Sequence, residues 1–279
     1  MGGLSATATT TAPAGGAASE GAARGEILAA VRARLGLVAL LVALAGLAWW
    51  ATVQRMAGMD AAPGADLGAL GWFVATWVVM MAAMMLPSVS PTVALYARMT
   101  SRRGPARPLL FTAAYVLVWG SVGVAAYAVF SVARNRWGGA LSWDGGGHWI
   151  AAAVLAAAAL YELTPLKDAC LSRCRSPLGY LLGNWRSSHA GAARMGAGHA
   201  AWCVGCCWAL MAALFALGIM SLTWMAVVAA LITVEKTLPG RATVTRSTAA
   251  LLLLLAVGVA LAPHSVPGLS TPGAGMGSM

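Results

Sequence analysis

Residues 195–218 read MGAGHAAWCVGCCWALMAALFALG, a run apolar enough to cross a membrane as one helix. Such a crossing needs about 20 mostly apolar residues. Cys203, Cys206 and Cys207 lie within five consecutive residues of this run. Thiols are soft ligands that bind metals after deprotonation. The run therefore poses two questions: how many such helices the chain has, and whether its thiols hold a metal.

The rest of the chain has the same apolar character. Of its 279 residues, 60% are hydrophobic and 9% are charged, whereas soluble domains carry roughly 25% charged residues. The composition predicts an all-α, polytopic transmembrane helical bundle, a multi-pass protein of the cell membrane. The net charge of +10 does not indicate a nucleic acid partner, because basic loops between spans are typical of the cytoplasmic side.

Basic residues predict the topology of the bundle. Seven segments qualify, or nearly qualify, as spans: 35–54, 70–90, 109–133, 148–165, 195–218, 221–237 and 246–263. All but three of the 18 Lys and Arg residues then fall on the same side as the N-terminus. The positive-inside rule places that side in the cytoplasm.

The two ends of the chain differ from the segment between them. Residues 1–30 are rich in Ala, Gly, Thr and Ser, and residues 264–279 are rich in Gly, Pro and Ser. Such compositions are typical of disordered tails. We therefore expect a transmembrane domain over residues 31–263.

The longest predicted cytoplasmic loop, residues 166–194, contains a helix signal. Ser176 and Pro177 form a good helix start. Apolar residues follow at helical spacing, at Leu178, Leu181, Leu182 and Trp185. The pattern predicts one amphipathic helix on the cytoplasmic membrane surface.

A stripe of soft ligands is predicted on the fifth span. His199, Cys203 and Cys206 or Cys207 recur every three or four residues, so they share one face of a helix. A second soft set lies on the second span, where Met80, Met81, Met84 and Met85 form two pairs one turn apart. Thioethers bind Cu(I) without placing anions in lipid. The predicted topology puts both sets in the cytoplasmic half of the membrane.

Four further residues collect at the same depth. Glu162 and Glu235 lie near the inner ends of their spans, where ionisable residues face a cavity or a partner. For Glu235, the alternative is an ion pair with Lys236 or an interfacial position; for Glu162, Lys167 or an arginine of the loop could be the partner. Cys170 and Cys174 lie one helical turn apart in the cytoplasmic loop, beside arginines that would stabilise thiolates. These two thiols are a candidate entrance to the membrane site, or else an unused thiol pair.

These segments resemble a bacterial family of predicted metal-binding integral membrane proteins, whose members are sometimes named copper chaperones. The resemblance covers roughly residues 70–245. It rests on Met80 to Ser88, Tyr161 to Lys167 continuing into Cys170 to Pro177, Gly198 to Trp208, and Glu235-Lys236. It implies a metal-related role in a bacterial inner membrane.

Three functions are compatible with these residues. The first is a non-enzymatic Cu(I)-binding protein that accepts or moves copper, with a metal-transfer protein as partner; zinc is the alternative ion, although methionine does not suit it. The second is a membrane thiol oxidoreductase using the Cys203–Cys206 spacing. The third is a non-catalytic subunit whose cysteines and methionines are packing residues.

Overall fold

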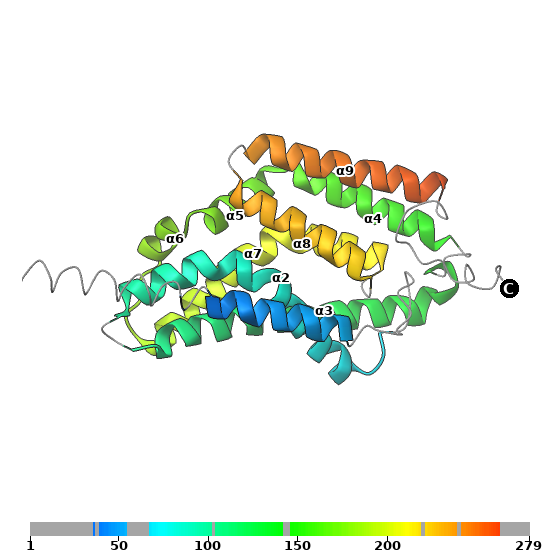
Figure 1. Cartoon of the computed structure of the whole chain (residues 1–279). Coiled ribbons are helices and arrows are strands. Elements are labelled where there is room, and N and C mark those ends of the chain that lie inside the picture. Colours follow the sequence, from blue (N-terminus) through cyan, green and yellow to red (C-terminus); the bar gives the residue numbers. More distant parts are fainter. Residues whose placement is uncertain are drawn as a thin grey trace, which may run out of the picture.

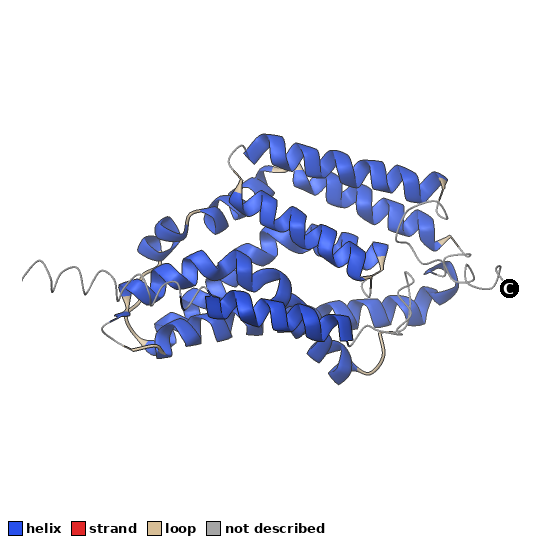
Figure 2. Cartoon of the chain, in the orientation of Figure 1, coloured by secondary structure: helices blue, strands red, loops and turns tan. Residues whose placement is uncertain are grey.

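The structure, a computed structural model, describes residues 36, 39–54, 67–101, 104–141, 146–218, 221–238 and 241–262. Every regular element in these segments is a helix, and none of the residues described forms a strand (Figure 2). The all-α prediction is therefore confirmed. The predicted tails, residues 1–30 and 264–279, lie outside the described residues.

The labelled helices follow one another along the chain and pack into a bundle (Figure 1). They are α2 (Leu70–Met99), α3 (Ala106–Leu141), α4 (Gly147–Glu162), α5 (Pro165–Arg175), α6 (Pro177–Gly183), α7 (His189–Leu217), α8 (Leu222–Thr237) and α9 (Arg241–Leu261). A further apolar helix, Ala39–Gln54, precedes α2. Helices α4 and α9 lie side by side along one edge of the bundle.

Four of these helices are long and apolar enough to cross a membrane, namely α2, α3, α7 and α9. The bent pair α4 and α5 passes the same test when taken together, which makes up to five. Helix α8 has 16 residues and Ala39–Gln54 is also short. Each of the seven predicted spans therefore coincides with a helix, but the number seven is not confirmed.

Helices α4 and α5 meet at a bend of 67°. Pro165 starts α5 at its first position, where the missing N–H costs no hydrogen bond. Thr164 caps the new helix, because its Oγ1 accepts a hydrogen bond from the backbone N–H of Lys167 at 3.3 Å. The bend turns α5 against α7, so residues predicted to lie in a loop become part of the packed bundle.

Helix α7 packs against α3, α4, α5 and α8. Glycines permit two of these close approaches. A Cβ at Gly196 would lie 2.1 Å from the carbonyl oxygen of Phe111 in α3, and one at Gly205 would lie 2.7 Å from Cys170 Sγ in α5. Small residues at such positions let helices approach closely. The cysteine-rich helix is thereby held in the middle of the bundle.

Helix α6 corresponds to the predicted amphipathic helix and starts at Pro177 as expected. It ends at Gly183, so Trp185 lies beyond it and the predicted four-residue face is too long. Leu178 and Leu182 are exposed, while Leu181 is buried. The apolar face is therefore split between the protein core and the outside.

Candidate metal centre

Three cysteine sulfurs from two helices meet in the core. Cys174 comes from α5, and Cys203 and Cys206 come from α7. Their Sγ atoms all lie within 4.8 Å of one another, and Cys174 Sγ is 3.7 Å from Cys206 Sγ. Cys203 and Cys206 are three residues apart, so both face α5. We call these three residues the thiol cluster.

The two remaining cysteines are buried beside the thiol cluster but outside it. Cys207 Sγ lies 3.3 Å from Cys206 Sγ, but it is not one of the sulfurs that all lie within 4.8 Å of one another. Cys170 lies one turn before Cys174 and packs against Gly205. The predicted entrance pair is therefore divided, because Cys174 joins the thiol cluster and Cys170 fills space beside α7.

Cys203 has three polar or polarisable neighbours from three other helices. The Lys236 ammonium of α8 donates to its Sγ at 3.1 Å, and the Tyr115 hydroxyl of α3 lies 3.0 Å from it. Met85 Sδ of α2 lies 4.0 Å away. Hydrogen bonds from charged donors are roughly twice as strong as neutral ones. Lys236 and Tyr115 therefore favour the thiolate form of Cys203.

Two prolines interrupt the backbone hydrogen bonds of α2 beside Met85 and Ser88. Pro87 and Pro91 lie inside the helix and remove backbone donors. The Ser90 hydroxyl donates to the Pro87 carbonyl at 2.8 Å, which satisfies the acceptor that Pro91 leaves free. Ser88 donates to the Met85 carbonyl at 2.9 Å and accepts from Lys236 at 3.2 Å.

The other predicted methionines are buried in α2. Met81 lies one turn before Met85 on the same face, whereas Met80 and Met84 lie on a neighbouring face. Met85 is thus the predicted methionine that the structure places in contact with a thiol.

His199 is buried one turn before Cys203 and lies outside the thiol cluster. Its ring packs among Phe111, Tyr115 and Tyr180, and its Nδ1 has no hydrogen-bond partner among the described residues. Burial and the nearby Cys174 thiol raise the pKa of Tyr180 to about 12, so its hydroxyl stays protonated and donates to the Met195 carbonyl at 2.6 Å.

Glu162 and Glu235 face a lysine rather than a thiol. Lys167 Nζ lies 2.7 Å from Glu162 Oε1 and 2.8 Å from Glu235 Oε2. The suggested ion pair between Glu235 and Lys236 is wrong, because adjacent helical residues point in different directions and Lys236 turns to Cys203. We call Glu162, Lys167 and Glu235 the carboxylate trio. The carboxylate trio is separate from the thiol cluster.

The arginines of α5 do not support the thiolates as the sequence suggested. The Arg173 guanidinium stacks over the Trp202 ring at 5.3 Å, and Arg175 donates to the carbonyl of Leu238. Among the residues that the structure describes, the cation that donates a hydrogen bond to a thiol is Lys236.

Sequence reasoning therefore missed Tyr115 and the contact of Lys236 with Cys203, and it named Lys167 only as one of the cations that could reach Glu162. A signal for the lysines was present in the composition, since only two of the 18 basic residues are lysines and arginine fills every other basic position. Both lysines reach buried partners. Tyr115 had no comparable signal, because it lies in an apolar helix far from the cysteines in sequence.

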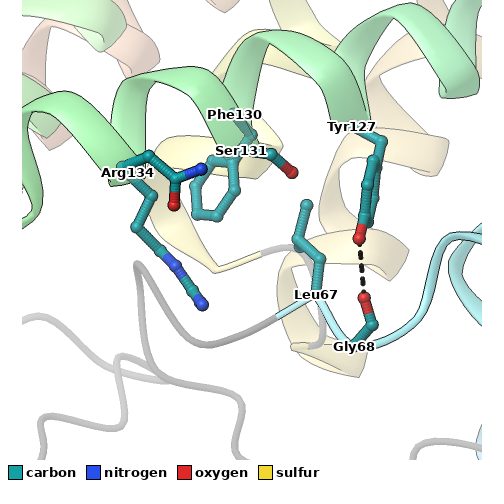
Figure 3. A pocket seen from close by; sticks show the side chains of 7 residues that line it. Leu67, Gly68, Tyr127, Phe130, Ser131 and Arg134 are labelled. Carbon is teal, nitrogen blue, oxygen red and sulfur yellow. Dashed lines mark hydrogen bonds between the residues drawn. The ribbon is translucent and has the colours of Figure 1, made fainter.

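Two cavities among the described residues lie away from these groups. A pocket of about 350 Å³ at the far end of α3 is lined by residues including Leu67, Tyr127 and Arg134, and the Tyr127 hydroxyl donates to the Gly68 carbonyl at 2.9 Å (Figure 3). An apolar groove of about 480 Å³ lies between α3, α4 and α7. Neither is lined by a predicted metal ligand.

A family model described as the copper chaperone PpoB2 matches residues 74–259, well over half of the chain. The chain belongs to the PpoB2 copper chaperone family. The matched region contains the thiol cluster, Met85 and both lysines. This confirms the family resemblance found in the sequence. No curated protein and no solved structure matches the chain.

Proposed function

We propose that this PpoB2 family chain is an integral membrane protein that accepts Cu(I) at Cys174, Cys203 and Cys206 and passes it to a partner protein. The observation that carries the proposal is the meeting of three buried sulfurs from α5 and α7 within 4.8 Å. Thiolates and thioethers are the ligands that Cu(I) prefers. The role is binding and transfer rather than catalysis.

The surrounding atoms favour Cu(I) over zinc. Structural zinc sites have four ligands of Cys, His or carboxylate type. Around Cys203, the next neighbours are the Met85 thioether, the Tyr115 hydroxyl and the Lys236 ammonium. A thioether suits Cu(I), and an ammonium has no lone pair to offer any metal. The nearest candidates in sequence for a fourth zinc ligand are Cys207 and His199, and neither belongs to the group of sulfurs that all lie within 4.8 Å of one another.

Lys236 compensates negative charge at the proposed copper site. In the metal-free protein, its ammonium is the positive partner of a Cys203 thiolate. Cu(I) binding would release the proton of a second thiol of the cluster to water, so that one Cu(I) and two thiolates carry a net charge of −1, which the Lys236 ammonium still balances. This matters because an unpaired charge inside a protein is strongly destabilising.

Cys174 is the point of entry and exit in this proposal. It is 9% exposed, whereas Cys203 and Cys206 are each 1% exposed. It also lies on α5, beyond the bend that ends α4. With the N-terminus in the cytoplasm, as the arginine distribution predicts, α5 and Cys174 lie on the cytoplasmic side.

Copper binding by the purified chain tests the proposal. The chain is extracted in detergent, loaded anaerobically with Cu(I) and an excess of reductant, and separated from free metal. We expect wild-type protein to retain about one Cu(I) per chain with a sulfur-only shell in X-ray absorption. The variant C174A/C203A/C206A is expected to retain none.

The variant C170A is the matched control, because Cys170 is equally buried on α5 but lies outside the cluster. It should bind copper as wild type does. Size-exclusion profiles and helical circular dichroism establish that each variant is folded. Equal copper retention by wild type and the triple variant would overturn the proposal, as would release of the chain from membranes by an alkaline wash.

A further inference from the structure

The carboxylate trio joins three helices at the bend beside α7. Glu162 is the last residue of α4, Lys167 lies in the first turn of α5, and Glu235 lies near the end of α8. The side chains of Glu162 and Lys167 are 0% exposed and that of Glu235 is 2% exposed. The trio is therefore sealed from solvent.

The charges of the carboxylate trio do not balance. Two carboxylates and one ammonium leave a net charge of −1 in the core. Each carboxylate also uses one oxygen on Lys167, and the second oxygens, Glu162 Oε2 and Glu235 Oε1, are buried with no donor among the described residues. A buried polar group without a partner costs about 1–3 kcal/mol, and a charged one costs more.

Nearby ionisable groups do not supply the missing positive charge. The groups around the trio are the Cys207 thiol from α7, the Cys170 thiol from α5 and the Tyr161 hydroxyl from α4. Tyr161 donates to the Gly205 carbonyl at 2.6 Å. Lys236 follows Glu235 in the chain but donates to Cys203.

We propose that the carboxylate trio is a proton-binding site, in which one proton is held between the free oxygens of Glu162 and Glu235. Both carboxylates contact the same nitrogen, so the two carboxyl groups are neighbours. The proton comes from water and forms an O–H bond on one carboxyl group, which donates to the other. The trio then has zero net charge, and both orphaned oxygens have a partner.

A metal ion fits the trio less well than a proton. Cu(I) prefers sulfur, and hard cations such as Ca²⁺ need six or more oxygens. The ammonium of Lys167 already lies between the carboxylates and repels a second cation. A proton needs one oxygen on each side, which is what the trio offers.

Infrared spectroscopy of metal-free protein tests this assignment. The chain has four glutamates, Glu20, Glu26, Glu162 and Glu235, so ¹³C labelling of glutamate carboxyls identifies their bands. We expect a protonated-carboxyl C=O band at neutral pH that shifts with the label. E162Q and E235Q should each remove this band, because glutamine replaces the acid that shares the proton. E26Q is the matched control and should keep it.

Two results would overturn the proton site: a wild-type spectrum without a protonated glutamate band, or a band that survives in both E162Q and E235Q. Glutamine keeps the size of the acid and can donate to the remaining carboxylate, so the single variants should fold. If one of them does not, the other carries the test alone. The experiment contains no copper, so its outcome is independent of the proposed copper site.

Discussion

Lys167 and Lys236 are the two lysines of this chain, and they end in contrasting surroundings. Lys167 is bound by two carboxylates, each at hydrogen-bonding distance, and the group is closed to solvent. Lys236 lies against the Cys203 thiol and the Ser88 hydroxyl, next to two more thiols and a thioether. One ammonium is held by hard oxygen ligands, and the other by soft sulfur.

The contrast separates a fixed ion pair from an exchangeable one. A carboxylate binds an ammonium strongly and has little preference for Cu(I), so the trio keeps its lysine and ties α4, α5 and α8 together. A thiolate prefers a soft metal to an ammonium, so Cu(I) can replace the Lys236 hydrogen bond at Cys203 Sγ while the ammonium still balances the charge of the copper–thiolate group. Glu235 and Lys236 are consecutive in α8, and this helix therefore takes part in both sites.

The largest expected effect comes from removing the lysine of the trio. K167M leaves the buried glutamate pair and its remaining negative charge without a cation, and breaking a buried ion pair in this way costs about 3–5 kcal/mol. Unfolding of the detergent-solubilised protein, followed by circular dichroism, measures the loss. The neutral variant E162Q/K167M/E235Q is the matched control and should recover most of the stability. A K167M protein as stable as wild type would show that the trio does not hold the helices.

The next largest effect concerns Cu(I) affinity, which should depend more on one cysteine of α7 than on its neighbour. C206S should weaken Cu(I) binding by more than the roughly 10- to 100-fold caused by loss of an outer-shell partner, because Cys206 belongs to the cluster. C207S should change the affinity only a few-fold, since Cys207 Sγ contacts Cys206 Sγ but lies outside the group of three sulfurs. Competition with a chromophoric Cu(I) chelator measures both. Equal losses in the two variants would mean that the bound metal uses a different set of sulfurs.

Lys236 can be tested without metal. K236M removes a charged hydrogen bond that contributes about 1.5–3 kcal/mol, so the Cys203 thiolate should be less populated. Alkylation of Cys203 by N-ethylmaleimide should slow by roughly ten- to hundredfold, as followed by peptide mass spectrometry, because the thiolate is the reacting form. K236R keeps a cation at this position and should react faster than K236M. An unchanged alkylation rate in K236M would show that Lys236 does not stabilise the Cys203 thiolate.

The smallest effect is expected at Met85. M85L conserves volume, so folding should change by less than about 1.5 kcal/mol, while the loss of the thioether should weaken Cu(I) binding by less than about tenfold. M80L is the matched control on the neighbouring face of α2, and its copper affinity should equal that of wild type. A larger effect at Met80 than at Met85 would contradict the geometry of the site.

The sequence predicted where helices form more accurately than it predicted which helices pack into the bundle. Each predicted span coincides with a helix, because a run of apolar residues must satisfy its backbone hydrogen bonds locally. The bend between Glu162 and Lys167 was not predicted, although Thr164 and Pro165 are a helix start. The region after it was treated as a loop with one amphipathic helix. It contains α5 and α6, and α5 packs into the bundle.

The candidate site was only partly predictable, because the sequence does not show which helix faces pack against one another. Helical spacing grouped Cys203 with Cys206, and both were found in the thiol cluster. Spacing also grouped Cys170 with Cys174, but the packing of α5 on α7 directs one thiol to Gly205 and the other to Cys206. Residue type suggested Glu162 and Glu235 as metal ligands, whereas the structure pairs both with Lys167.

By itself, the sequence determined an all-α chain with soft ligands arranged on helical faces, because helix periodicity is a local property. Only the tertiary structure decided which faces meet. Glu235 and Lys236 are neighbours in sequence, yet they point about 100° apart on α8 and enter two different sites. A metal ion responds to distances of a few ångströms between atoms of separate helices, and those distances depend on the bend at Pro165 and on close packing at Gly205.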